Sequence, residues 1–206
     1  MWGFLDCTRY YQSFGVTKIV LDRASLVVGT QEKLGLLVPA GEGKSTIMKI
    51  LGGFLQPTTG QVLLDGKPAT HLSGPAAEAA GIVVIHQEFN LVPDLSVAAN
   101  IFLGREITRG PRLDHRAMAE AAAALLARLD TPIRPTALIR DLSVPDRQMV
   151  EIAKALSRQA RVLIMDEPSA ALTHREVESL YAQVDRLRAE GVALLFCSHR
   201  LDEVAR

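Results

Sequence analysis

The chain has 206 residues, of which 48% are apolar and 22% are charged, and these are ordinary values for a packed globular protein. The composition therefore excludes a disordered chain, and the length fits one large domain or two small ones. Lys plus Arg and Asp plus Glu number 23 each, so the formal net charge is zero. A neutral chain is not expected to bind nucleic acid or an anionic membrane through general electrostatic attraction.

The two cysteines, Cys7 and Cys197, are too few for a disulfide scaffold or a cysteine-rich zinc site. Cys197 lies in an apolar run, VALLFCSH, and is predicted to be a reduced core residue. No stretch is apolar for long enough to cross a membrane, and the start of the chain lacks a charged-then-apolar leader. We therefore expect a soluble, cytoplasmic protein.

Short apolar runs alternate with helical patterns along the chain. Four runs lack polar alternation and predict strands that are buried on both faces, as in parallel sheets; they span residues 34–38, 82–85, 162–165 and 192–196. Two more exposed strands are predicted at 19–28 and 61–65, the second ending at an Asp-Gly turn signal. The sequence therefore predicts an α/β fold with a mostly parallel sheet.

The helical patterns have apolar residues at i, i+3, i+4 and i+7. The first is formed by Ile47, Ile50, Leu51 and Phe54. Three others span 118–129 after a predicted cap at Asp114, 149–156, and 177–187 after a capping box of Thr173 and Glu176. The region from about 90 to 142 is mostly helical and punctuated by prolines, which predicts a helical subdomain inserted between two core strands.

The segment LGLLVPAGEGKSTIMKIL has the order required for a phosphate-binding loop: a buried strand, a turn with glycines, and a helix that opens at Lys44, Ser45 and Thr46. Backbone N–H groups and the positive end of the helix dipole would hold phosphate oxygens. Lys44 would reach the β- and γ-phosphates, and the Ser45 hydroxyl would bind Mg²⁺. The alternative is an ordinary strand-to-helix turn.

This loop departs from the G-x-x-x-x-G-K-[ST] pattern, because Val38 stands where the first glycine is expected. Pro39 and Ala40 follow it, and Pro39 lacks an N–H donor. The donors of Gly41, Glu42, Gly43 and the three residues after them are present, so we expect weakened rather than abolished phosphate binding.

A second candidate site is VLIMDEPSAALT, in which a buried strand delivers Asp166 and Glu167 to its carboxyl end. Ligands of α/β sheets bind at that end of the strands. Asp166 would hold Mg²⁺ through a water, and Glu167 would orient or deprotonate an attacking water. Taken alone, such a pair could also be a solvated turn.

Three further features carry possible chemistry. In LSVPDRQMVEIAKALS, Ser143 is predicted to cap a helix with Asp146 as its reciprocal partner, and the capped N-terminus would suit a γ-phosphate on a facing molecule. Gln87 and His199 each follow a predicted strand, where a nucleotide site would lie. The alternatives are an ordinary capped amphipathic helix and polar residues with structural roles.

Together these segments resemble the ATP-binding subunit of an ABC transporter, and the resemblance covers nearly the whole chain. The motifs occur in the order of the family: Walker A GEGKST, Gln87 of the Q-loop, signature LSVPD, Walker B VLIMDE, D-loop AALT and His199 of the H-loop. GIVVIHQEFNLVPDLSVAANIFLGRE, QMVEIAKALS and EPSAALT followed by SHRLDEV resemble the branch that imports monosaccharides of the ribose, galactose or xylose type.

The resemblance implies a P-loop NTPase core with a mostly parallel sheet, antiparallel strands at the N-terminus and an inserted helical subdomain. It implies one ATP-binding domain over 1–206, incomplete at its C-terminus. Core parts at 1–89 and 158–206 would flank a helical subdomain, with the signature motif, at 90–157. The chain stops seven residues after His199, and MWGFLDCTRYYQ lacks the usual opening strand pattern, so we expect a truncated copy.

The resemblance also implies a mechanism in which two such domains enclose two MgATP molecules. Ser143, Val144 and Asp146 would serve the partner's nucleotide. Gln87 would sense the γ-phosphate and contact Mg²⁺, Glu167 would act on water, and His199 would steady the γ-phosphate. An aromatic ring would stack on adenine, and Phe14, followed by Tyr11, is the candidate, although either could be a core or edge residue.

The partners implied are a second ATP-binding domain, transmembrane permease subunits and, indirectly, a periplasmic or extracellular sugar-binding protein, with no nucleic acid. The chain would lie at the inner face of the cell membrane, held there by the permease. The expected function is ATP hydrolysis that powers sugar import. The alternatives are a degenerate or truncated fragment without activity of its own, and an ABC ATPase without membrane partners.

Overall fold

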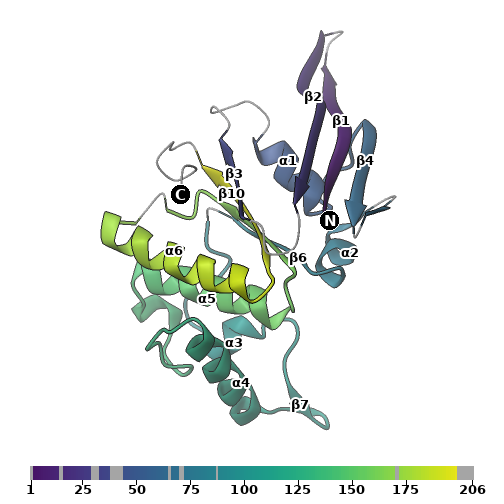
Figure 1. Ribbon diagram of the computed structural model, residues 1–206. Coiled ribbons are helices and arrows are strands. Elements are labelled where there is room, and N and C mark those ends of the chain that lie inside the picture. Colours follow the sequence, from purple (N-terminus) through teal and green to yellow (C-terminus); the bar gives the residue numbers. More distant parts are fainter. Residues whose placement is uncertain are drawn as a thin grey trace. The chain divides into compact units, whose positions relative to one another are not determined.

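The computed structural model describes residues 2–13, 16–28, 33–37, 44–64, 66–69, 72–86, 88–169 and 172–198, with side chains from Thr46 to Phe196. The chain forms two compact units. The first comprises residues 1–84, 160–167 and 186–206, and the second comprises residues 85–159 and 168–185. Figure 1 shows the strands and helices of both units.

The first unit contains an antiparallel sheet with the strand order β2-β1-β4-β5. Its strands are β1 (Trp2–Ser13), β2 (Val16–Val28), β4 (Thr59–Leu64) and β5 (Lys67–Pro68). β1 is the central partner of β2 and β4, and its register shifts between Phe4 and Tyr10. The N-terminal segment, whose sequence lacks the opening strand pattern usual in the family, is therefore a long strand, and the antiparallel N-terminal strands that the resemblance implied are present. The polar residues and bulges that interrupt its alternation obscure the period of two.

A second sheet has the order β3-β10-β9-β6. Its strands are β3 (Lys33–Leu37), β6 (Ile82–Ile85), β9 (Val162–Asp166) and β10 (Ala193–Ser198). β10 runs parallel to both β3 and β9. Leu163, Ile164 and Met165 of β9 are fully buried, as expected for a strand covered on both faces. All four strands predicted from apolar runs are present within a residue or two.

The core of the first unit lies between this sheet and helix α1 (Lys44–Leu51). Four apolar residues of α1 pack against alternate residues of two strands, Val162 and Ile164 of β9 and Ala193 and Leu195 of β10. The short helix α2 (Gly74–Ala79) adds Ala77 to the same cluster. The prediction that Phe54 continues the buried face of α1 is wrong, because the helix ends at Leu51 and Phe54 is 63% exposed.

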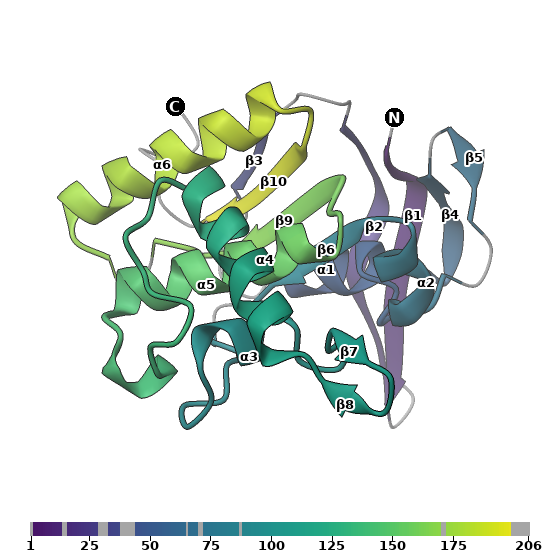
Figure 2. The ribbon, with the colours of Figure 1, turned by 90° about the horizontal axis from the view of Figure 1, so that it is seen from below.

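The second unit is largely helical. It contains α3 (Val97–Ile101), α4 (His115–Arg128), the 3₁₀ turn η1 (Ile139–Asp141), α5 (Val144–Ser157) and most of α6 (His174–Ala189). It also contains a small hairpin of β7 (Thr108–Arg109) and β8 (Arg112–Leu113). Helices α3, α4 and α5 pack on one another, and Figure 2 shows them side by side.

The predicted helix caps are confirmed. Asp114 accepts a hydrogen bond from the backbone N–H of Ala117 at 2.9 Å and begins α4. The carboxylate of Glu176 accepts hydrogen bonds from both the backbone N–H and the hydroxyl of Thr173, each at 2.7 Å, where α6 begins. These contacts lie within one helical turn, which is why sequence alone could locate them.

A fully buried side chain, Asn100 of α3, holds the loop that precedes this helix. Its Oδ1 accepts a hydrogen bond from the N–H of Val92 at 2.7 Å. Its Nδ2 lies within hydrogen-bond distance of the carbonyls of Val92, Leu95 and Ser96, at 3.1, 3.3 and 3.0 Å. Backbone groups inside a protein need hydrogen-bond partners, and this loop forms no helix or strand that would supply them. The Asn100 side chain supplies partners for some of them.

Two side chains of α5 hold the same loop at Asn90. The carboxylate of Glu151 accepts a hydrogen bond from the N–H of Asn90 at 2.7 Å, and the ammonium of Lys154 donates one to its carbonyl at 2.8 Å. We call this arrangement the Asn90 clamp. Glu151 is buried, and burial raises its pKa despite the opposing effects of Lys154, the Asn90 N–H, Arg158 and His86. The clamp therefore includes a carboxylate that is costly to ionise.

Replacement of Asn100 by alanine is expected to lower the free energy of unfolding by about 1–3 kcal/mol, because the hydrogen bonds of this fully buried amide to the loop would be lost. Urea unfolding measures this change, and hydrogen exchange at Val92 localises it. The matched control is Ser96→Ala, which removes only the cap hydrogen bond to Ala99 and should cost about 1 kcal/mol. Equal losses in the two variants would contradict the role given to Asn100.

The raised pKa of Glu151 predicts a pH dependence of stability. The folded protein binds this proton more tightly than the unfolded chain, so the stabilisation is present below pH 4.5 and is lost as the pH rises through the folded-state pKa. Glu151→Gln keeps an acceptor oxygen without a charge and should escape that loss. Relative to the unmodified protein, its free energy of unfolding should therefore rise with pH.

Urea unfolding at several pH values, from 4.5 up to about 7, tests this expectation. The control is Glu120→Gln, which neutralises an exposed carboxylate paired with Arg116 on α4. A difference between Glu151→Gln and the unmodified protein that stays constant or shrinks with rising pH would contradict the prediction.

Candidate functional site

Three parallel strands bring their carboxyl ends to one edge of the second sheet. Leu37, the last residue of β3, is paired with Ser198, the last residue of β10, and Cys197 beside it is paired with Asp166 at the end of β9. The chain segments that follow these strands therefore leave from the same edge. In α/β sheets, that edge is where ligands bind.

Two carboxylates lie at this edge. Asp166 ends β9 and Glu167 follows it, and both are partly exposed although the strand behind them is fully buried. Glu167 has a φ of 46°, in the left-handed region that a residue with a Cβ rarely adopts. Backbone strain of this kind occurs mainly where the surrounding structure must aim a functional side chain.

Helix α1 begins at Lys44, after the segment that follows β3. Its first turn contains no acidic residue, so nothing there opposes an anion at the positive end of the helix. The backbone of Lys44 and Ser45 belongs to this turn, and Thr46 is buried beneath it. The helix start and the two carboxylates together fit a nucleotide phosphate with its Mg²⁺, because that ion is commonly held by one or two carboxylates plus phosphate oxygens.

Several predicted site residues lie outside the described residues. They are Phe14, Gly41, Glu42, Gly43, Gln87 and His199. The backbone places two of them by sequence adjacency only: Gly43 directly precedes α1, and His199 directly follows Ser198.

The predicted signature turn begins α5 in the second unit. The Ser143 side chain caps the helix by accepting the N–H of Asp146 at 3.3 Å. The Ser143 hydroxyl also donates to the Asp146 carboxylate at 2.6 Å, so Asp146 is its reciprocal partner through a side-chain hydrogen bond. Pro145 lies in the first turn, where its missing N–H leaves no helix bond unmade.

The cap reduces the number of backbone donors that this turn presents. The N–H of Asp146 is used by Ser143, Pro145 has none, and the N–H of Arg147 bonds to the carbonyl of Ser143 at 3.0 Å. The donor of the first turn that the cap leaves available is the N–H of Val144. The first turn of α5 therefore presents fewer backbone N–H groups to a ligand than an uncapped helix start would.

Sequence analysis did not single out the Asn90 clamp. Its partners lie 61 and 64 residues apart along the chain, so no local pattern reveals them. The available signal was a pair of charged residues, Glu151 and Lys154, spaced i and i+3 in a helix that is otherwise mostly apolar. In the sequence, the loop that the clamp holds begins three residues after Gln87.

The described residues include no helix that is both long enough and apolar enough to span a membrane. Within the same residues, no group of three or more His, Cys, Asp or Glu side chains could hold a metal ion by itself.

Comparison with known proteins identifies the fold. A family model described as ABC transporter matches residues 21–170. A solved dimeric structure of a bacterial ABC transporter cassette superposes with a TM-score of 0.82 at 23% identity, over 100% of this chain and 90% of that one. The α/β P-loop NTPase core predicted from sequence is thereby confirmed.

Two curated relatives are more similar in sequence. A ribose import ATP-binding protein of Rubrobacter xylanophilus is 50% identical over 196 residues, which are 93% of this chain and 39% of that protein. A Burkholderia ambifaria protein, named as a candidate ribose/galactose/methyl galactoside import ATP-binding protein, is 50% identical over 187 residues, or 91% of this chain and 36% of that protein. The chain thus spans less than two fifths of these relatives. Since the family model matches most of its residues, the chain belongs to the ABC transporter family.

Proposed function

We propose that the chain is an ATP-binding and ATP-hydrolysing unit that powers the import of a small sugar. The observation that carries the proposal is the convergence of β3, β9 and β10, because the Asp166–Glu167 pair lies at the same sheet edge as the end of β3, from which the chain leads to α1. The names of the two relatives support a monosaccharide as the cargo. Whole relatives are much longer than this chain, so activity, cargo and partners belong to this proposal.

The binding roles follow the phosphate-binding loop. The N–H groups of Gly41, Glu42, Gly43 and Thr46 would hold phosphate oxygens, and Lys44 would neutralise the β- and γ-phosphates. Mg²⁺ would be held by Ser45, Gln87 and Asp166, and when bound it would offset the charge of the bridging phosphate oxygens. Phe14 would stack on the adenine ring.

The chemical role falls to Glu167. Its carboxylate would accept a proton from a water whose oxygen forms a bond to the γ-phosphorus while the bond to the leaving ADP oxygen breaks. His199 would hold the γ-phosphate during this step. The constrained backbone of Glu167 supports the assignment, because it fixes the direction in which the carboxylate leaves the strand.

The proposed assembly pairs this domain with a second ABC ATP-binding domain, so that Ser143 and Asp146 face the partner's ATP. A dimeric cassette among the solved structures supports such pairing. Permease subunits would hold the pair at the cytoplasmic face of the membrane and receive sugar from an external binding protein. Residues 1–206 would form one ATP-binding domain, with its helical subdomain at 90–157.

Glu167→Gln is expected to retain MgATP binding and to lower the hydrolysis rate by about 10²–10⁴-fold, because it removes the proton acceptor and keeps the size of the side chain. Phosphate release measured beside nucleotide binding tests this expectation. Glu120→Gln, which alters an exposed carboxylate of α4, is the matched control. Equal turnover in the Glu167 variant and the unmodified protein would exclude Glu167 as the base.

MgATP at about 100 times its Kd should stabilise the chain by about 2.7 kcal/mol and raise its melting temperature by several degrees. Lys44→Ala should lose this shift, whereas Lys49→Ala, an exposed lysine in the last turn of the same helix, should keep it. Thermal unfolding with and without MgATP makes the measurement. No shift in the folded, unmodified chain would favour the alternative, an ABC fragment whose loop with Val38, Pro39 and Ala40 no longer binds nucleotide.

A further inference from the structure

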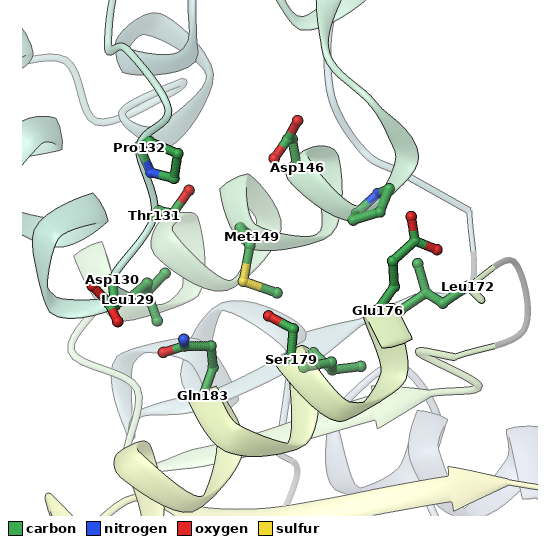
Figure 3. Close-up of a pocket in the computed structure, with 12 residues that line it drawn as sticks. Leu129, Asp130, Thr131, Pro132, Asp146, Met149, Leu172, Glu176, Ser179 and Gln183 are labelled. Carbon is green, nitrogen blue, oxygen red and sulfur yellow. The ribbon is translucent and has the colours of Figure 1, made fainter. Parts of the chain in front are cut away.

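The second unit contains a cavity of about 170 Å³ between the end of α4 and the first turns of α5 and α6. Figure 3 shows its lining, which these three regions contribute. The apolar part of the lining consists of Leu129, Pro132, Pro145, Met149, Leu172 and Leu180. The lining includes Pro145 and Asp146 of the proposed signature turn.

A buried amide lines this cavity. Gln183 of α6 is only 7% exposed, and within the described part of the chain its Oε1 has no hydrogen-bond partner. Figure 3 shows the side chain extending from α6 towards the end of the cavity where Leu129 and Asp130 lie. A buried acceptor without a donor is costly, so the atom indicates a donor that the described residues do not supply.

The charges around the cavity indicate that this donor carries a positive charge. Asp130, Asp146 and Glu176 line it, and its twelve lining residues include no Lys, Arg or His. Glu176 accepts two hydrogen bonds from Thr173, which lower its pKa and keep it ionised. Asp146 accepts the Ser143 hydroxyl. The lining thus combines several negative groups with a buried neutral acceptor.

The lining also limits the ligand class. In the described residues, no cluster of His, Cys, Asp or Glu has the arrangement needed for a metal ion. The six apolar side chains instead provide a surface for hydrocarbon, which a hydrated ion would not use. A planar guanidinium or an ammonium on a short aliphatic chain has donors for the acceptors and methylenes for the apolar wall.

We propose that this cavity is a binding site for a small organic cation of the guanidinium or ammonium class. One N–H of the cation donates to Oε1 of Gln183, its charge faces Asp130, Asp146 and Glu176, and its aliphatic part lies against Met149 and the neighbouring apolar residues. This proposal does not rest on the proposed function, although the lining includes Asp146, which the proposed function assigns to the partner's ATP.

The experiment measures binding of n-butylguanidinium by calorimetry and compares it with n-butylurea, a neutral analogue of the same shape. The unmodified chain should bind n-butylguanidinium at least about tenfold more tightly than n-butylurea, because a hydrogen bond to a charged group is the stronger one. Gln183→Met removes the acceptor at similar volume and should weaken binding of the cation by about tenfold or more.

The matched control is Gln148→Met. Gln148 is another buried amide with an unpartnered side-chain atom, its Nε2, but it does not line the cavity. This variant should bind n-butylguanidinium as the unmodified chain does. Thermal unfolding checks that both variants fold, and Asp130→Asn, at an exposed position, provides a second variant that should weaken binding of the cation.

A peptide arm identifies the source of the cation. If acetyl-Gly-Arg-Gly-amide binds as tightly as n-butylguanidinium, the site accepts an arginine side chain of another protein; weaker peptide binding assigns it to a free small molecule. The proposal is overturned if the cation does not bind, if n-butylurea binds equally well, or if Gln183→Met binds the cation unchanged. Any of these outcomes would mean that water fills the cavity and satisfies Gln183.

Discussion

The parallel pairing of β10 with β3 and β9 is the constraint on which the candidate nucleotide site depends. The interior residues of β9 are fully buried, so its backbone groups must be paired with neighbouring strands rather than with water. That pairing fixes the register, and the register places Leu37, Ser198 and Asp166 at one edge. A shift of one residue would turn buried side chains to the opposite face and would move Asp166 relative to the start of α1. The strand register that buries the side chains is therefore also the register that fixes the geometry of the candidate site.

In the helical unit, the loop from Asn90 to Ser96 forms no helix or strand that would pair its backbone groups. Asn100 and the Asn90 clamp pair some of its backbone groups. The backbone N–H groups of Ile139 and Arg140 pair others, the carbonyls of Leu95 and Pro93. Placing Glu151 here costs free energy, since burial opposes the ionisation of its carboxyl group. An apolar side chain would avoid that cost but could not accept the Asn90 N–H. The clamp therefore favours one conformation of the loop over maximal stability, and this loop begins three residues after the predicted Q-loop residue Gln87.

Local patterns explain what the sequence could predict. The buried strands were found because runs such as Ile82–Ile85 need no information from elsewhere, and the caps at Asp114 and Thr173 were found because a cap and its partner lie in one turn. The pattern of the first residues did not by itself reveal β1, because its irregular register depends on β2 and β4, although the family resemblance implied antiparallel strands there. Asn100 and Glu151 were missed because their partners are backbone atoms, which carry no residue-specific signal. Asp166 and Glu167 were located correctly at a strand end, but the left-handed backbone of Glu167 could only come from the structure.

Buried polar groups of the helical unit fall into two kinds, and the contrast between them supports a ligand at the cavity. Asn100 and Glu151 are buried as deeply as Gln183, yet the chain supplies each with close hydrogen-bond partners. The same fold leaves Oε1 of Gln183 without one among the described residues, in a cavity whose lining includes three carboxylates. An apolar side chain of similar size would remove that cost, as it would not at Asn100 or Glu151, where a backbone donor would lose its acceptor. The cost at Gln183 is therefore best offset from outside the chain, by a donor that enters the cavity.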